Sequence, residues 1–415
     1  MNAEIISVGT ELLLGNIVNT DARDLSIMLS ELGINVYWHT VVGDNPARLT
    51  AAVAAAKERA DVIITTGGLG PTCDDLTKQT LCAAFGKEMY FDERAEADLR
   101  AYFKGRVMTD NNLQQCYLPV GCTPFYNTCG TAPGCGFQVG NGKIVLMLPG
   151  PPKEMNAMMR HGGIDFLRSL SDEGIWTHNI MTFGMGESNI EDKLRGRMNA
   201  LTNPTLAPYA KEGEVRLRVT AKAAGEAEAE ALMAPVIAEV RRTLGDIVYA
   251  VDTPSLEQTV LELLKERGET FAAAESCTGG LVAKRFTDLP GASAVFRGGV
   301  TVYTNDAKRA LLGVDPDALS PEDGAVSFEV AMDLAENVRE TLGADYGVGI
   351  TGVAGPDSDG IHPVGTVFVG LASADGVTVR ALELGERSDR TRIRTLAANH
   401  AFDMLRRKMT GLPVI

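Results

Sequence analysis

The chain has 415 residues, of which 45% are hydrophobic and 22% charged, with a formal net charge of −15 at pH 7. This length exceeds what a single hydrophobic core usually organises, so we expect two or three domains in a soluble globular protein. The negative charge excludes nucleic acid as the leading partner, because only a local basic patch could bind a polyanion.

The cysteines and the apolar runs indicate the cellular compartment. Seven cysteines are an odd number, and none of them forms a C-x-x-C pair, so neither a disulfide framework nor a zinc site is indicated. No run of about 18 apolar residues is present, and the first residues lead directly into an apolar strand pattern instead of a signal peptide. We therefore expect a cytoplasmic protein with reduced thiols.

The first 172 residues alternate between short apolar runs and helical periodicity. The pattern predicts strands over residues 3–8, 34–42, 61–66 and 143–148, and helices over residues 21–32 and 46–59. Such alternation predicts an α/β domain in which a parallel sheet carries helices on both faces, that is, three layers.

Glycines and polar residues follow these predicted strands. Because the carboxyl ends of parallel strands meet at one edge of a sheet, we expect a ligand site there. The candidate binding residues are Gly9, Thr10, Glu11, Gly67 and Gly68. The candidate ligands of a divalent cation are Asp44, Asp75 and Glu154, since carboxylates suit a hard cation that bridges phosphate oxygens. Alternatively, Asp74 or Asp75 only caps a helix that begins near Leu76.

The pattern changes after about residue 173, where strands and helices no longer alternate one by one. Strands are predicted over residues 180–183 and 214–220, and helices over residues 188–198 and 227–244. This is the pattern of a small α+β module. We expect it to be a spacer or an oligomerisation element.

The last domain begins near residue 252, where Ser255 is a predicted cap for a helix over residues 256–267. An apolar run over residues 271–274 then leads into Glu275, Ser276 and a glycine pair, which predicts a strand, a tight turn and a helix. Ser276 would lie at a helix N-terminus, where backbone N–H groups favour an anion or an oxyanion. The alternative is that this serine only caps the helix.

Lys308 is the candidate partner of Ser276. It lies in the first turn of another predicted helix, for which Asn305 and Asp306 look like the cap. The helix dipole would lower the pKa of a lysine at that position, which suits a neutral amine acting as a base on a serine. Cys277 is an alternative nucleophile, although a lone cysteine is more often a small buried residue.

The remaining patterns complete an α/β domain. We predict a helix over residues 327–342, a strand over 345–350, a turn over 351–356, a hairpin of strands over 364–371 and 377–382, and a closing helix over 390–409. An arginine at the start of the closing helix is a reasonable clamp for a phosphate, and the candidates are Arg390 and Arg394.

Five spaced motifs of this domain resemble the nicotinamide mononucleotide deamidase domain of the CinA family. They cover residues 274–280, 303–308, 324–327, 349–356 and 363–366. The resemblance implies an amidohydrolase that converts nicotinamide mononucleotide to nicotinic acid mononucleotide and ammonia. Its catalytic residues would be Ser276, Lys308 and Tyr303, and no cofactor is required. The implied substrate contacts are Thr278, Gly279, Gly280, Thr351, Gly352, Gly355, Arg390 and Arg394.

The rest of the chain is similar to the same family. The first domain resembles the molybdopterin-binding fold of the MoaB and MogA type, which in this family implies hydrolysis of ADP-ribose with Mg, Mn or Co. Residues 19–21 read Asn-Thr-Asp where the family usually has Asn-Thr-Asn. The middle module resembles a KH domain, but no Gly-x-x-Gly loop is placed between helices, so we expect no binding of nucleic acid.

The sequence therefore predicts three domains, over residues 1–172, 173–251 and 252–415, in a homodimeric enzyme with two hydrolytic activities in NAD salvage. The alternative is a regulatory protein that binds a nucleotide or a pterin without catalysis and is linked to competence or DNA damage. A degenerate domain would be expected to lose Ser276 or Lys308, and both are present. This favours an enzyme.

Overall fold

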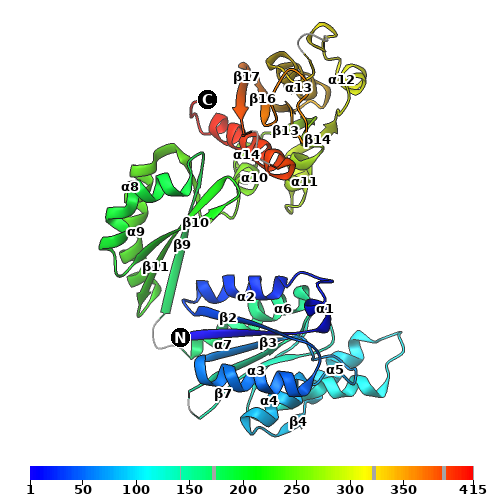
Figure 1. The fold of residues 1–415 in the computed structure, drawn as a ribbon, viewed down its shortest axis with the longest axis vertical. Helices are drawn as coiled ribbons and strands as arrows, with labels where there is room; N and C mark the ends of the chain where they lie inside the picture. Colours follow the sequence, from blue (N-terminus) through cyan, green and yellow to red (C-terminus); the bar gives the residue numbers. More distant parts are fainter. Residues whose placement is uncertain (141, 171–173, 320–323, 386–388, 415) are drawn as a thin grey trace. The chain divides into compact units, whose positions relative to one another are not determined.

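The computed structural model describes residues 1–140, 142–170, 174–319, 324–385 and 389–414. Contacts divide the chain into two compact units, Met1–Thr177 with Thr220–Ala231, and His178–Val219 with Leu232–Ile415. Most of the middle segment therefore packs with the C-terminal domain (Figure 1). The domain boundary predicted at residue 172 lies outside the described residues. Among the described helices, none is long and apolar enough to cross a membrane.

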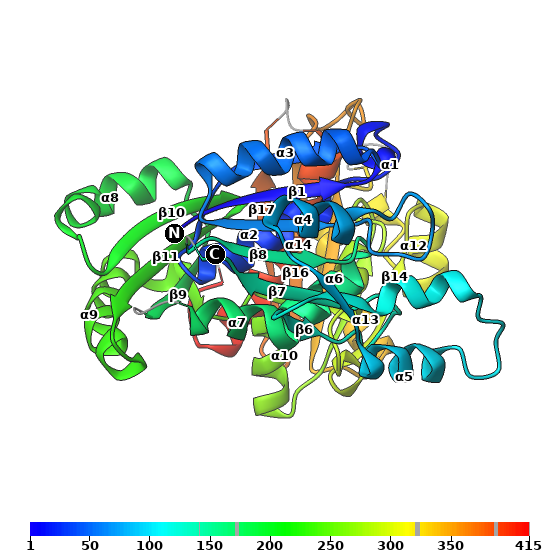
Figure 2. The same cartoon turned by 90° about the horizontal axis from the view of Figure 1, so that it is seen from below.

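The N-terminal sheet has the strand order β2-β1-β3-β8-β7-β6. Its strands are β1 (Asn2–Val8), β2 (Asn35–Val42), β3 (Val62–Thr66), β6 (Thr123–Phe125), β7 (Gly134–Gln138) and β8 (Ile144–Leu148). The first four in this order are parallel, which confirms the predicted alternation. Strand β7 runs antiparallel to both of its neighbours, β8 and β6, so the sheet is mixed; β7 and β8 are seen next to each other in Figure 2.

Helices cover both faces of this sheet. One face carries α2 (Thr20–Glu31), α6 (Pro152–Met158) and α7 (Ile164–Ser169), and the other carries α3 (Pro46–Arg59) and α4 (Thr77–Phe85). Neighbouring residues of one strand serve the two cores, since Ile5 packs in the first and Ile6 in the second. The remaining elements are α1 (Thr10–Leu13), α5 (Glu93–Tyr102) and a two-stranded sheet of β4 (Met89–Phe91) and β5 (Tyr117–Pro119).

The middle module has a four-stranded sheet of order β10-β11-β9-β12. Its elements are β9 (Gly174–Phe183), α8 (Glu187–Ala200), β10 (Thr205–Lys211), β11 (Glu214–Ala223), α9 (Glu226–Leu244) and β12 (Val248–Val251). The α+β prediction is confirmed. The prediction omitted β10, whose apolar pattern is irregular, and β12, which is only four residues long.

The C-terminal sheet has the order β14-β13-β15-β16-β17. Its strands are β13 (Phe271–Glu275), β14 (Phe296–Thr301), β15 (Tyr346–Gly352), β16 (Thr366–Ser373) and β17 (Gly376–Glu383). The first three run parallel, and the last two form the predicted antiparallel hairpin. The helices are α10 (Leu256–Arg267), α11 (Leu281–Thr287) and α14 (Arg390–Met409) on one face, and α12 (Asn305–Leu312) and α13 (Phe328–Thr341) on the other.

The centre of this sheet is β13, with β14 on one side and β15 on the other. Phe271 and Ala273 pack into the core shared with α10, α11 and α14, whereas Ala272 and Ala274 face α12 and α13. The chain therefore leaves β13 toward one neighbour and returns on its other side. This reversal is a topological switch point, where open α/β sheets bind ligands beyond the carboxyl ends of the strands.

Glycines in β15 and β16 let α13 approach the sheet closely. A Cβ atom at Gly349 would lie 2.4 Å from the backbone nitrogen of Ala335 and 2.5 Å from the carbonyl oxygen of Ala331. Gly370 meets the same carbonyl at 2.3 Å. Because backbone atoms cannot move aside as a side chain can, a larger residue at these positions would push the helix away.

Gly349→Ala should therefore destabilise the C-terminal domain by about 1–3 kcal/mol, the usual cost of overpacking. A suitable control is Gly196→Ala in α8, where a Cβ atom meets nothing within 4 Å. The control should be neutral or stabilising by about 0.5–1 kcal/mol, because alanine is the better helix residue. Calorimetric midpoints of the two variants compare them, and equal midpoints would contradict this account of the helix packing.

Candidate active site

Ser276 lies directly after β13, at the switch point of the C-terminal sheet. The side chain is 8% exposed, and its backbone N–H donates to the carbonyl oxygen of Ile350 in the neighbouring strand at 2.9 Å. Gly279 and Gly280 have φ angles of 58° and 90°, a left-handed conformation that glycine adopts without strain. We call the segment formed by residues 276–280 the nucleophile turn. The Ser276 hydroxyl makes no hydrogen bond to any residue that the structure describes, so it is available to a ligand.

Glu275 closes this turn, and the sequence analysis missed it. Its carboxylate is 1% exposed and accepts hydrogen bonds from the backbone N–H groups of Val282 at 3.0 Å and Ala283 at 2.9 Å. The N-terminus of α11 is therefore filled by a carboxylate of the chain itself. The predicted anion at this helix start is therefore a side chain of the protein, where the sequence analysis expected an anion of a ligand. A carboxylate at the end of an otherwise apolar strand was the available signal, because a buried charge needs donors of this kind.

The nucleophile turn still offers hydrogen-bond donors. The N–H group of Gly279 is used, since it donates to the carbonyl oxygen of Ser276 at 3.0 Å. Within the described part of the chain, the N–H groups of Thr278 and Gly280 have no acceptor. The Thr278 hydroxyl is also buried without a partner among those residues. These groups can bind a negatively charged oxygen on a substrate.

Lys308 is buried, with 1% of its surface exposed. Helix α12 begins one residue earlier than predicted: the cap is Thr304, whose hydroxyl accepts from the Ala307 N–H at 3.1 Å. Burial lowers the pKa of the Lys308 ammonium, and the nearby Cys277 thiol opposes this only in part. No carboxylate or other acceptor among the described residues pairs with the amine. The cause of the lowered pKa is therefore burial, more than the helix dipole invoked from the sequence.

Cys277 is an unsuitable nucleophile in this setting. The side chain is 5% exposed, and burial raises the pKa of its thiol to about 12. The negative charge of Glu275 acts in the same direction. Because the thiolate is the reactive form, a thiol with this pKa is inert near neutral pH.

Two arginines of α14 tie the site together. Arg394 donates to the carbonyl oxygen of Thr278 at 2.6 Å, which holds the nucleophile turn. Arg390 donates to the carbonyl oxygen of Gly355 at 2.7 Å and to the hydroxyl of Tyr303 at 2.7 Å. Both candidates for a phosphate clamp therefore lie at the carboxyl edge of the parallel strands, as expected.

Tyr303 follows β14 and is 57% exposed. Its hydroxyl accepts from Arg390, whereas no hydrogen bond joins it to Lys308 in the residues described. The exposed ring can contact a ligand.

Thr351 and Gly352 belong to β15, which ends two residues beyond its predicted end at residue 350. The Thr351 hydroxyl donates to the carbonyl oxygen of Ala325 at 2.6 Å, so it can offer a ligand only its lone pairs. A Cβ atom at Gly352 would lie 2.7 Å from the Val367 side chain, so the glycine permits strand packing. Gly355, with a φ angle of 81°, contributes its carbonyl oxygen to Arg390.

The N-terminal domain also gathers its predicted residues at the carboxyl edge of its sheet. Thr10 donates through both its N–H, at 2.9 Å, and its hydroxyl, at 2.8 Å, to the carboxylate of Asp44. Glu11 lies over Gly9, where a Cβ atom would be 2.5 Å from the carboxylate. Close packing also explains the glycine pair: a Cβ atom at Gly67 would meet the carbonyl oxygen of Val8, and one at Gly68 the Thr77 hydroxyl, each at 2.1 Å.

The three candidate metal ligands are not brought together as a metal site. Asp44 binds Thr10, Asp75 accepts from the backbone N–H of Thr72 at 2.8 Å, and Glu154 accepts from the Asn127 amide at 2.6 Å. Nowhere in the described chain do three His, Cys, Asp or Glu side chains lie close enough to hold a metal ion. The residues present do not form a preformed cation site.

The alternative prediction, that Asp74 or Asp75 caps the following helix, is also wrong. Helix α4 starts at Thr77, its cap position is Leu76, and no side chain caps it. Asp74 and Asp75 instead accept from the Thr72 hydroxyl. Asp21, the residue that departs from the family pattern, lies in the first turn of α2. It is buried, its Oδ1 has no partner among described residues, and burial raises the pKa of its carboxyl to about 7.

Comparison with known proteins places these features in a family. Three family models match in chain order: the probable molybdopterin binding domain over residues 4–169, the damage-inducible protein CinA KH domain over 177–250, and the CinA C-terminal domain over 253–409. A solved CinA structure of unknown function from Thermoplasma acidophilum is 36% identical, with a TM-score of 0.37. It covers 41% of this chain and 98% of its own.

Relatives of full length are also similar. A putative competence-damage inducible protein of Bacillus cereus strain AH187 is 48% identical over 412 residues, which is 99% of each chain. A CinA-like protein of Desulfovibrio desulfuricans is 48% identical over 416 residues, covering 100% of this chain and 97% of the relative. With the domain order and the whole length matched, the chain belongs to the CinA family.

Proposed function

We propose that the C-terminal domain hydrolyses the carboxamide of nicotinamide mononucleotide to the carboxylate, with release of ammonia. The observation that carries this proposal is Lys308, a buried amine next to the nucleophile turn whose charge no described residue compensates. A buried charge without a counter-charge is costly, so the neutral amine is favoured, and a neutral amine is the form that accepts a proton. Attack on an unactivated amide needs such a base beside a hydroxyl.

The reaction proceeds in two stages. In the first, the Ser276 hydroxyl oxygen attacks the carboxamide carbon while its proton passes to the Lys308 amine. The resulting oxyanion accepts hydrogen bonds from the N–H groups of Thr278 and Gly280. The C–N bond then breaks, and the departing nitrogen takes a proton from the Lys308 ammonium and leaves as ammonia.

The second stage removes the acyl group from the serine. A water molecule loses a proton to Lys308 and attacks the ester carbon. The ester bond breaks, and the Ser276 oxygen recovers its proton from Lys308. The products are a carboxylic acid and ammonia, and the enzyme returns to its starting state.

The substrate's other groups match the rest of the site. A 5′-phosphate suits Arg390 and Arg394, because guanidinium groups bind phosphate oxygens in pairs. The pyridinium ring is a delocalised cation, and the exposed face of Tyr303 offers it a cation–π contact. Since Glu275 fills the start of α11 and the N–H groups of the turn serve the oxyanion, we assign the phosphate to the arginines.

Ser276→Ala and Lys308→Met should each lower kcat for ammonia release by at least about 1,000-fold, because the two groups act as a unit. The double variant should be no worse than either single one. Cys277→Ala should retain most of the activity, since its thiol stays protonated. Release of ammonia and nicotinic acid mononucleotide by the full-length chain is the measurement. A fully active Ser276→Ala variant, with Cys277→Ala inactive, would assign the nucleophile to the cysteine.

The pH dependence of kcat/KM should follow Lys308. The amine must be neutral to accept a proton, so the rate should rise with pH through a single ionisation below the ordinary lysine value of 10.5 and then level off. Stability has the same sign: the unfolded chain binds more protons between the lowered pKa and 10.5, so the contribution of Lys308 to stability rises with pH there.

Two variants check this profile. Lys308→Met should lose the ionisation and be at least as stable as the natural chain at neutral pH, because it no longer buries an ammonium group. Cys277→Ala should keep the ionisation and move it to lower pH, because the thiol partly opposes the lowering of the Lys308 pKa. A profile that is flat in the natural chain, or an ionisation that persists in Lys308→Met, would argue against a lysine base.

For the N-terminal domain we propose hydrolysis of ADP-ribose to AMP and ribose phosphate. The supporting observation is the link between Thr10 and Asp44, which joins the exits of two parallel strands at one edge. Asp44→Asn removes the charged acceptor of the Thr10 N–H and hydroxyl, so it should lower this activity at least about tenfold. Asp61→Asn at the opposite edge, where the carboxylate accepts from the Asn2 N–H, is the control. Equal rates in both variants would exclude this edge as the site.

A further inference from the structure

Helix α14 belongs at once to the candidate active site and to the surface on which the middle module packs. Its first turns carry Arg390 and Arg394, which bind the turns after β15 and β13. Its middle and end belong to a single core with Phe183 of β9 and Tyr249 of β12. The ring of Phe183 meets the His400 ring edge-on at 4.9 Å. The position of the arginines is therefore connected to the module through one helix.

One contact with α14 is made by the tight turn between β10 and β11, formed by Glu212 and Gly213. Gly213 has a φ angle of 75°, and a Cβ atom there would lie 2.5 Å from the Leu396 side chain and 3.0 Å from the Asn399 amide nitrogen. The Asn399 amide donates to the carbonyl oxygen of Glu212 at 3.1 Å. Leu396 is two residues beyond Arg394, so this turn bears on α14 close to the arginines.

Asn399 extends the contact into the domain. Its side-chain oxygen accepts from Arg285 of α11 at 2.7 Å, and Arg285 is paired with Glu257 of α10 at 2.7 Å. Asn399 itself is 1% exposed. The turn of the module thus reaches α14 and α11 through partly buried polar contacts centred on the buried Asn399 side chain.

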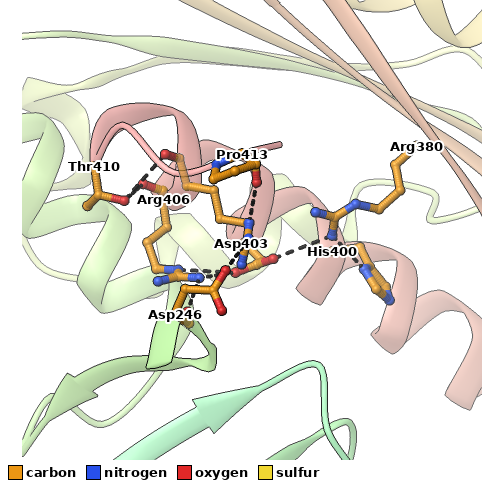
Figure 3. Close-up of polar contacts among 8 residues, drawn as sticks. Asp246, Arg380, His400, Asp403, Arg406, Thr410 and Pro413 are labelled. Atoms are coloured by element: carbon orange, nitrogen blue, oxygen red, sulfur yellow. Dashed lines mark hydrogen bonds and ion pairs between the residues drawn. The ribbon is translucent and has the colours of Figure 1, made fainter. Parts of the chain in front are cut away.

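A second contact holds the far end of the helix (Figure 3). Arg406 donates to the carbonyl oxygen of Asp246 at 3.1 Å, and Arg407 pairs with the Asp246 carboxylate. Asp246 lies in the short turn between α9 and β12 of the module. Arg406 and Arg407 are only 4% and 8% exposed, whereas the Asp246 side chain is 43% exposed, so both contacts are partly buried. The module therefore contacts α14 both at its middle and at its C-terminal end.

We infer that the turn formed by Glu212 and Gly213 is a positioning element of the candidate active site. It fixes α14 along its length and thereby sets where Arg390 and Arg394 meet the substrate. An α-helix rises about 1.5 Å per residue, so Leu396 and Arg394 are about 3 Å apart along its axis. Over so short a length of helix, a displacement at Leu396 is passed to Arg394 almost undiminished. A shift of about 1 Å in a clamping residue is enough to lower a rate up to about 100-fold. This inference rests on the proposed function only for its kinetic readout.

The test uses the full-length chain with Gly213→Val, which places a branched side chain against Leu396. We expect kcat/KM for nicotinamide mononucleotide to fall about tenfold, mainly through a higher KM, because the displaced arginines bind the phosphate less well. Amide hydrogen exchange over residues 391–398 should also become faster. Gly213→Ala should give the same pattern at smaller size and replaces the valine variant if that one does not fold.

Two further variants separate positioning from general destabilisation. Gly184→Val introduces the same side chain at a φ angle of 92° within the same module, but a Cβ atom there meets nothing within 4 Å. It should cost similar stability and leave both KM and the exchange of α14 unchanged. Adding Leu396→Ala to Gly213→Val removes the side chain with which the valine would clash. The double variant should therefore recover most of kcat/KM.

Each outcome decides one point. Equal effects of Gly213→Val and Gly184→Val, or no recovery with Leu396→Ala, would overturn the positioning role. Absence of ammonia release in the natural chain would refute the proposed function instead, and the exchange comparison over α14 would still decide whether the module positions the helix.

Discussion

The burial of one amine without a counter-charge is the constraint to which the C-terminal domain is adapted. Lys308 lies inside the fold, yet no described carboxylate approaches it closely enough to form an ion pair. Such a group is destabilising when charged, and it persists only where the surrounding structure is rigid enough to hold it. The closely packed β15 and α13, the capped nucleophile turn and the arginine ties of α14 supply that rigidity.

Much of this arrangement could be predicted from the sequence. The alternation of apolar runs gave the parallel sheet, and the convergence of Ser276, the Lys308 helix and the residues after β15 follows from the rule that parallel strands end at one edge. The arginines at the start of α14 were equally foreseeable. Each of these features depends on local sequence pattern and on sheet topology, and the spacing of apolar and polar residues predicts both.

Other features depend on contacts that spacing does not encode. Glu275 was passed over because its role rests on two backbone N–H groups seven and eight residues later, which only the folded turn brings to it. The carboxylates of the N-terminal domain show the opposite error. Asp44, Asp75 and Glu154 do follow three parallel strands of one sheet, but each side chain turns to its own partner, so shared topology did not make a shared site.

The ties of the nucleophile turn also constrain how a substrate can lie. Glu275 brings one buried negative charge to the turn, and Arg394 and Arg390 bring two positive charges. A phosphate dianion placed near Lys308 would stabilise the ammonium form, which cannot accept a proton. Under the proposed function, the phosphate of the nucleotide would therefore be bound by the arginines and kept away from Lys308, with only the amide placed at the buried amine. Under this proposal, electrostatics alone would set the orientation of the substrate, before its shape complementarity to the site is considered.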